Sequence, residues 1–132
     1  MRIYFAGPLF SAAERDWNAT LAAALRQEKE PGMDPAGIFA TDVGGIDWAD
    51  GIVAIMDGAD PDSGTCWEVG YAYRKKPIVL VRTDMRRNSG DGGSGYNAML
   101  AESATIRVDA VAAPIDRVAG EVLDALVRLE AA

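Results

Sequence analysis

Residues 52–81 read IVAIMDGADPDSGTCWEVGYAYRKKPIVLV, and the pattern of this segment indicates the fold class. It opens and closes with continuous apolar runs, at 52–56 and 77–81. Such runs are typical of parallel strands that are buried on both faces. A polar loop at 57–64 and a helical segment from about Thr65 to Lys75 lie between them. The stretch therefore predicts a strand, a crossover helix and a second strand parallel to the first.

The rest of the chain extends this alternation on both sides. Further strands are predicted at 2–5, 37–40 and 105–108. Helices are predicted after a capping box at 11–14, as one turn or slightly more at 46–50, at 96–103, and from Pro114 onward. The order predicts an α/β fold with a five-stranded parallel sheet and helices on both of its faces. Ligands of such sheets bind beyond the carboxyl ends of the strands.

Length, composition and charge limit the function. The chain has 132 residues, of which 49% are hydrophobic and 25% charged, as expected for one globular domain over 1–132. A net charge of -7 repels a phosphate backbone and argues against a nucleic-acid partner. The sequence has neither the ~18 consecutive apolar residues of a membrane span nor a signal-peptide pattern at its start. We expect a cytoplasmic protein with no membrane partner.

The counts of two residue types exclude several chemistries. The sequence contains no histidine, which excludes Ser-His-Asp and Cys-His nucleophiles and histidine-based metal sites. It contains one cysteine, which excludes internal disulfides and thiolate metal clusters. We therefore expect no metal site, and acid–base chemistry is left to carboxylates, tyrosines and lysines.

Acidic side chains gather at the predicted strand ends. They are Asp42 after the second strand, Asp57, Asp60 and Asp62 after the third, and Glu68 on the next helix. Several carboxylates in one crevice suit glycosidic-bond chemistry, in which one carboxylate attacks the anomeric carbon while another group moves the leaving group's proton. Each acid also has an ordinary interpretation. Loops favour Asp, and the T-x-x-E pattern at 65–68 fits a capping box in which Glu68 is structural.

Glu68 is predicted in the first turn of its helix, where the helix dipole favours the ionised carboxylate by ~0.3–1 kcal/mol. An ionised Glu68 would serve as a nucleophile rather than as a proton donor. Tyr4 could hold that carboxylate through its phenolic hydroxyl, although half-buried strand tyrosines are also common. The segment 84–95, DMRRNSGDGGSG, is either a disordered connection or a mobile loop over the site.

Several stretches together carry a family resemblance. They are IYFAGPLF at 3–10, ADGIVAIMDG at 49–58, DSGTCWEVGYA at 62–72, KPIVL at 76–80 and NAML at 97–100. With these motifs, residues 2 to about 108 resemble the nucleoside 2-deoxyribosyltransferase family. The resemblance implies a flavodoxin-like (Rossmann-like) three-layer sandwich with a five-stranded parallel sheet. It also implies retaining transfer of 2-deoxyribose from a nucleoside to a free nucleobase, with no metal or organic cofactor.

The resemblance also implies roles for individual residues. Glu68 would be the nucleophile, with Tyr4 as its hydrogen-bonding partner. Asp42 would exchange a proton with the base, and Asp62 would bind the sugar hydroxyls. Asn97 would bind the 5′-hydroxyl in a neighbouring subunit's site, which implies a homo-oligomer: either a dimer or a hexamer built from dimers. The matching motifs place two glycines, Gly7 and Gly64, in the substrate site.

Two alternative functions stay open. A sibling group hydrolyses nucleoside 5′-monophosphates as N-glycosidases, and its deoxynucleotide-hydrolysing members tend to have serine where this chain has Asn97 and to lack the acid of Asp62. These two residues favour an uncharged 5′-hydroxyl, because a carboxylate beside a phosphate is repulsive. The second alternative is a non-catalytic nucleoside- or nucleotide-binding module. The end of the chain at 129–132, LEAA, lacks the aromatic tail of some family members, so the preferred base stays open.

Overall fold

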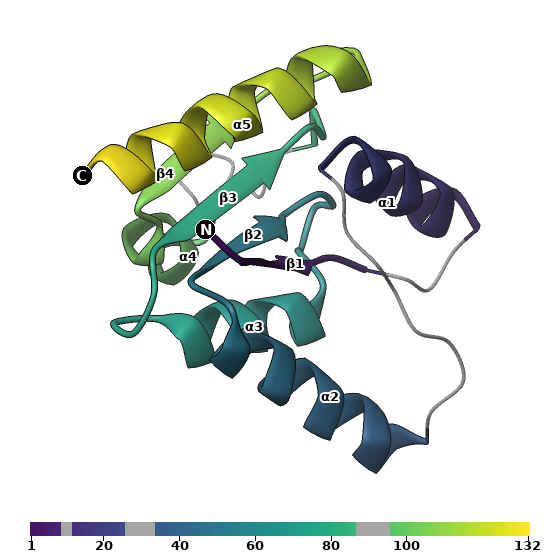
Figure 1. The fold of residues 1–132 in the computed structure, drawn as a ribbon. Coiled ribbons are helices and arrows are strands. Elements are labelled where there is room, and N and C mark those ends of the chain that lie inside the picture. The colour runs from purple at the N-terminus through teal and green to yellow at the C-terminus, as the bar shows by residue number, and fades with distance from the viewer. Residues whose placement is uncertain (9–11, 26–33, 87–95) are drawn as a thin grey trace.

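A computed structural model of the chain describes residues 1–8, 12–25, 34–86 and 96–132. Its centre is a four-stranded parallel sheet (Figure 1). The strands are β1 (Ile3–Ala6), β2 (Gly51–Ile55), β3 (Ile78–Arg82) and β4 (Ile106–Asp109), and they lie side by side in sequence order. The register pairs Tyr4 with Ile52, Ile52 with Ile78, and Val79 with Ile106.

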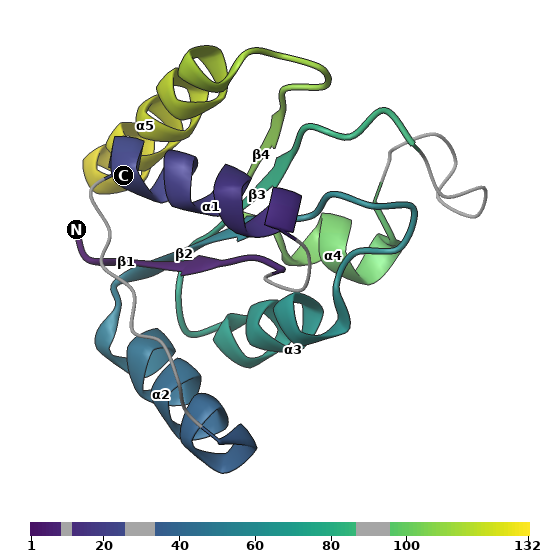
Figure 2. The same cartoon turned by 90° about the vertical axis from the view of Figure 1, so that its right-hand side faces the viewer.

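Helices cover both faces of this sheet, and both views show them there (Figures 1 and 2). One face carries α1 (Ala12–Leu25) and α5 (Ile115–Ala131). The other face carries α2 (Pro35–Trp48), α3 (Ser63–Ala72) and α4 (Ala98–Ser103). The prediction of an α/β fold with a parallel sheet between helices is confirmed.

The two central strands are buried throughout, as their continuous apolar runs predict. Alternate side chains point to opposite faces of a strand. Val53 and Val79 therefore join the core under α1 and α5, whereas Ile52 and Leu80 join the core under α3 and α4. Each helical layer thus rests on its own apolar cluster.

The strand predicted at 37–40 is wrong, because these residues lie inside α2, which begins at Pro35 and ends at Trp48. The turn predicted at 46–50 is helical over 46–48, where it forms the end of α2 rather than a separate element. Asp34 caps this helix, because its side chain accepts a hydrogen bond of 2.7 Å from the Gly37 backbone N–H. Within the described residues the sheet therefore has four strands rather than five.

The start of α3 corrects a second prediction. The helix begins at Ser63, and its N-cap is Asp62 rather than Thr65. The capping box predicted at 65–68 is therefore wrong, and Glu68 lies in the second turn of α3 instead of the first.

Two predicted features fall partly beyond what the structure describes. The capping box at 11–14 includes residue 11, which lies outside the described ranges. The segment at 84–95 is described only as far as Arg86. No helix in the described ranges is long and apolar enough to cross a membrane.

Candidate active site

A short hydrogen bond joins two residues that are far apart in the sequence. The Tyr4 hydroxyl on β1 donates to Glu68 Oε1 on α3 at 2.6 Å. Both side chains are partly buried. Tyr4 borders the core cluster that lies under α3, and Val69 and Ala72 anchor α3 to that cluster. The fold therefore forms the pair that the sequence predicts.

Burial controls the protonation of Glu68. Burial raises the pKa of Glu68 to about 7, the hydrogen bond from Tyr4 lowers it, and the charges of Asp42 and Asp62 raise it. The expectation that the helix dipole holds Glu68 ionised is wrong. Glu68 lies beyond the first turn of α3, and the effect of the dipole is confined to that turn. Burial and the bond to Glu68 also raise the pKa of Tyr4 well above its ordinary value, so Tyr4 keeps its proton near neutral pH.

Asp42 reaches the same site from an unexpected element. It lies on α2, not after a strand, and its side chain is half-buried. Its charge raises the pKa of both Tyr4 and Glu68, which places it beside the pair. Side chains from β1, α2 and α3 therefore meet at one site.

Asp62 has a structural role beside any role in binding. Its Oδ2 accepts hydrogen bonds from the Thr65 backbone N–H at 2.8 Å and from Thr65 Oγ1 at 3.0 Å. A Cβ at Gly64 would lie 3.1 Å from the same oxygen, so Gly64 leaves room for the cap. Asp62 nevertheless lies close enough to Glu68 for its charge to act on that carboxylate.

Asn97 and Gly7 make structural contacts of their own. Asn97 is exposed and caps α4, where its Oδ1 accepts from the Met99 backbone N–H at 2.8 Å. Among the described residues it makes no hydrogen bond to Tyr4 or Glu68. A Cβ at Gly7 would lie 3.0 Å from Asn18 Nδ2, which donates to the Pro8 carbonyl at 2.7 Å. Gly7 therefore permits close contact between α1 and the turn after β1.

Asp57, another acid of the predicted crevice, has partners of its own. Asp57 Oδ1 accepts from the backbone N–H of Thr83 at 2.6 Å and of Asp84 at 3.0 Å, and its Oδ2 accepts from Thr83 Oγ1 at 2.5 Å. Asp57 thus ties the segment after β2 to the segment after β3. Asp60 is exposed on the same loop.

Sequence reasoning missed one residue of the site. Gly45 on α2 lies against the Tyr4 ring, where a Cβ would come within 3.0 Å of Cδ2 and Cε2. A glycine carries no chemical group, so the sequence held no signal for this contact beyond the Gly44–Gly45 pair itself.

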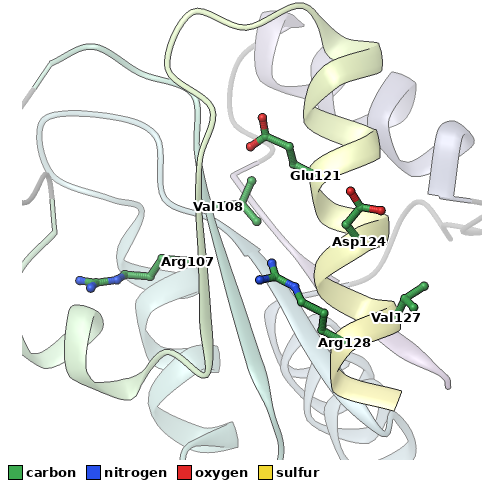
Figure 3. A pocket seen from close by; sticks show the side chains of 6 residues that line it. All are labelled: Arg107, Val108, Glu121, Asp124, Val127 and Arg128. Carbon is green, nitrogen blue, oxygen red and sulfur yellow. The ribbon is translucent and has the colours of Figure 1, made fainter. Parts of the chain in front are cut away.

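A separate hollow lies beside β4 and α5 (Figure 3). It is lined by Arg107, Val108, Glu121, Asp124, Val127 and Arg128. None of the predicted site residues lines this hollow. In the described part of the chain, no three His, Cys, Asp or Glu side chains are grouped so that they could hold a metal ion.

Comparison with known proteins identifies the family. The family model for nucleoside 2-deoxyribosyltransferase matches residues 3–99, which include Tyr4, Asp42 and Glu68. The chain belongs to the nucleoside 2-deoxyribosyltransferase family. Membership of this family indicates an enzyme that acts on the glycosidic bond of small nucleoside substrates. No curated protein matches the chain.

Two solved structures are similar over most of their length. The first is a conserved protein from Enterococcus faecalis V583, with 26% identity, a TM-score of 0.68, and coverage of 92% of this chain and 96% of that chain. The second is a 2-deoxyribosyltransferase from the psychrotolerant bacterium Bacillus psychrosaccharolyticus. It shares 25% identity, with a TM-score of 0.65 and coverage of 90% of each chain. The family assignment and the fold therefore agree.

Proposed function

We propose that this chain, as a single domain over 1–132, transfers 2-deoxyribose between nucleobases through a covalent intermediate on Glu68. The observation that carries the proposal is the 2.6 Å hydrogen bond from Tyr4 to a half-buried Glu68. A carboxylate in this place has one oxygen held by Tyr4 and a second oxygen left for attack. The family and the similarity to a 2-deoxyribosyltransferase support the same chemistry.

The first half-reaction forms the glycosyl-enzyme. A Glu68 oxygen attacks C1′ of a 2′-deoxynucleoside, the C1′–N bond breaks, and its electron pair leaves with the base. Asp42, beside Glu68, supplies the proton that the departing base takes up. Tyr4 keeps its own proton, because its pKa is raised, and stays a hydrogen-bond donor to Glu68 throughout.

The second half-reaction reverses these steps with a different base. A nitrogen of the incoming base attacks C1′, the bond to Glu68 breaks, and Asp42 takes back a proton. Two displacements at C1′ retain the configuration of the sugar. The 2′-deoxy sugar assists, because no electronegative 2′-oxygen destabilises the oxocarbenium-like transition state. No cofactor takes part in either step.

We propose in addition that the active form is a homo-oligomer. The family resemblance assigns Asn97 to a neighbouring subunit's site, and Asn97 is exposed, so a second copy of the chain can reach it. The surface of α2 supports association, since Ile38, Phe39 and Trp48 are exposed large apolar side chains on one helix.

One assay tests the reaction and separates it from its alternatives. The protein is incubated with deoxyinosine and free adenine, and deoxyadenosine is followed by chromatography. A parallel sample replaces deoxyinosine with its 5′-monophosphate and omits adenine. Formation of deoxyadenosine supports the transferase. Base release from the monophosphate alone would indicate the N-glycosidase, and ligand binding with no turnover in either sample would indicate a binding module.

Glu68→Gln tests the nucleophile. Gln preserves the acceptor for the Tyr4 hydroxyl but cannot attack C1′. We expect the folded variant to lose several orders of magnitude in transfer rate, on the order of 4 kcal/mol or more in barrier. In the unmodified protein, mass spectrometry of quenched samples should find a 2-deoxyribosyl adduct on Glu68. A folded Glu68→Gln protein with a near-native rate would overturn the mechanism.

A further inference from the structure

Two adjacent glycines in α2 have different surroundings. A Cβ at Gly44 would have no heavy atom within 4 Å, whereas a Cβ at Gly45 would lie 3.0 Å from both Cδ2 and Cε2 of Tyr4. Contacts this short are rare for real Cβ atoms, so the neighbour would have to move by a few tenths of an ångström. A glycine inside a helix costs about 1 kcal/mol relative to alanine, and the Tyr4 ring gives a physical reason for Gly45.

Crowding at the edge of the Tyr4 ring would also move the Tyr4 hydroxyl. The Tyr4 ring is rigid, so a push on Cδ2 and Cε2 also displaces the hydroxyl that donates to Glu68 Oε1 at 2.6 Å. Hydrogen bonds depend on distance and angle. A small displacement of the ring therefore weakens a bond that is short and well formed.

We propose that Gly45 is a positioning residue: its lack of a side chain lets the Tyr4 ring lie where its hydroxyl holds the Glu68 carboxylate. The catalytic meaning of this contact rests on the proposed function, in which Glu68 is the nucleophile. The contact itself does not, because it depends only on the packing of α2 against β1.

The surroundings of Glu68 predict how a change at Gly45 would appear. The titratable groups that act on Glu68 are Tyr4 from β1, Asp42 from α2 and Asp62 from the start of α3. Of these, Tyr4 lowers the pKa of Glu68, and the two acids raise it together with burial. Weakening the bond from Tyr4 leaves the raising effects unopposed.

The experiment compares Gly45→Ala with Gly44→Ala as a matched control. Both changes raise helix propensity equally, but only Gly45→Ala meets the Tyr4 ring. The carboxyl carbon of Glu68, assigned by its loss in Glu68→Gln, is titrated by ¹³C NMR without substrate. In Gly44→Ala, we expect the titration midpoint of Glu68 to equal that of the unmodified protein. In Gly45→Ala, we expect this midpoint to be higher by roughly half a pH unit or more. The pH below which the transfer rate falls should rise by the same amount in Gly45→Ala.

A Tyr4→Phe background shows whether Gly45 acts through the hydroxyl. Tyr4→Phe alone should raise the titration midpoint of Glu68, and adding Gly45→Ala should raise it no further. The proposal would be overturned if Gly45→Ala left the Glu68 midpoint unchanged. It would also be overturned if Gly45→Ala shifted that midpoint as much in the Tyr4→Phe background as in the unmodified protein. If Gly45→Ala does not fold, Tyr4→Leu/Gly45→Ala should fold as well as Tyr4→Leu; failure of that double variant would also overturn it.

The titration separates the two proposals. A midpoint that shifts as expected, in a protein that transfers no 2-deoxyribose, would support Gly45 as a positioning residue and refute the proposed reaction. Active transfer with an unshifted midpoint would refute the role of Gly45 alone.

Discussion

The half-buried carboxylate of Glu68 makes the site sensitive to pH near neutrality. Burial raises the pKa of Glu68 to about 7, so its carboxylate becomes protonated as the pH falls through that value. A protonated carboxyl cannot attack C1′. We therefore expect the transfer rate at saturating substrate to fall roughly tenfold per pH unit well below pH 7, as Glu68 becomes protonated. A series of initial rates between pH 5 and 9 measures this limb.

Asp62→Asn tests whether the pKa of Glu68 causes the fall of the transfer rate at low pH. The change removes a negative charge that raises the pKa of Glu68, while its amide oxygen still accepts from Thr65. The limb should move to lower pH, and KM should rise if Asp62 also binds the sugar. Asp50→Asn, on an exposed ion pair with Arg2, serves as the control for a lost surface charge. A limb unchanged by Asp62→Asn would contradict the electrostatic explanation.

At the scale of elements, the start of α2 determines where Asp42 and Gly45 lie. Asp34 accepts from the Gly37 backbone N–H at 2.7 Å and so caps the helix. We expect Asp34→Ala to lower the free energy of unfolding by about 1 kcal/mol, measured by urea denaturation. Asp34→Asn keeps a capping oxygen and should stay close to the unmodified protein. Equal losses in both variants would show that charge, rather than the cap, stabilises α2.

The same element shows where sequence reasoning reached its limit. The pair Asp34–Pro35 was interpreted as a break after the preceding helix. It equally fits the start of a new helix, with Asp34 as the N-cap and Pro35 at the first helical position. The apolar stretch at 37–40 is too short for its periodicity to separate strand from helix. The buried runs of β2 and β3 were unambiguous, and their prediction is confirmed.

The site was predictable to a similar extent. The residues alone left the pairing of Tyr4 with Glu68 as one option, and the family resemblance implied it. The structure contains the hydrogen bond. The turn of α3 that carries Glu68 was predicted wrongly, because both Asp62 and Thr65 are good N-cap residues and only tertiary structure chooses between them. The pKa of Glu68 depends on burial, which no local pattern encodes.

At the scale of the whole molecule, one buried cation joins the segments after two strands. Arg82 is 2% exposed. Its guanidinium donates to the carbonyls of Met56 at 2.7 Å and Gly58 at 3.1 Å, and also to that of Arg86. Removing it leaves the carbonyls of buried Met56 and partly buried Gly58 without this donor.

We therefore expect Arg82→Met to lower the free energy of unfolding by on the order of 3 kcal/mol, as measured by urea denaturation. Arg107→Met, at an exposed position on β4, should change it by less than about 0.5 kcal/mol. Similar small changes in both variants would show that the segments hold their shape without Arg82.

Subunit mixing tests the proposed homo-oligomer. Glu68→Gln and Asn97→Ala each damage every site of a pure oligomer. If the two residues of one site come from different subunits, a mixed dimer has one site with both changes and one intact site. Unfolding the two variants together and refolding them should restore roughly a quarter of the native rate. No gain over the separate variants would place Asn97 outside the neighbouring site.

The order of the strands has a consequence for how the chain folds. Ile52 pairs with Ile78, and Val79 with Ile106, but Ile3 pairs with Gly51 across a loop nearly twice as long. Closing that loop costs about 0.6 kcal/mol more entropy per doubling of length, and both α1 and α2 lie within it. We expect β2, β3 and β4 to associate before β1 docks. Because Tyr4 arrives on β1, we expect a refolding chain to bury its central sheet first and to form the Tyr4–Glu68 hydrogen bond last.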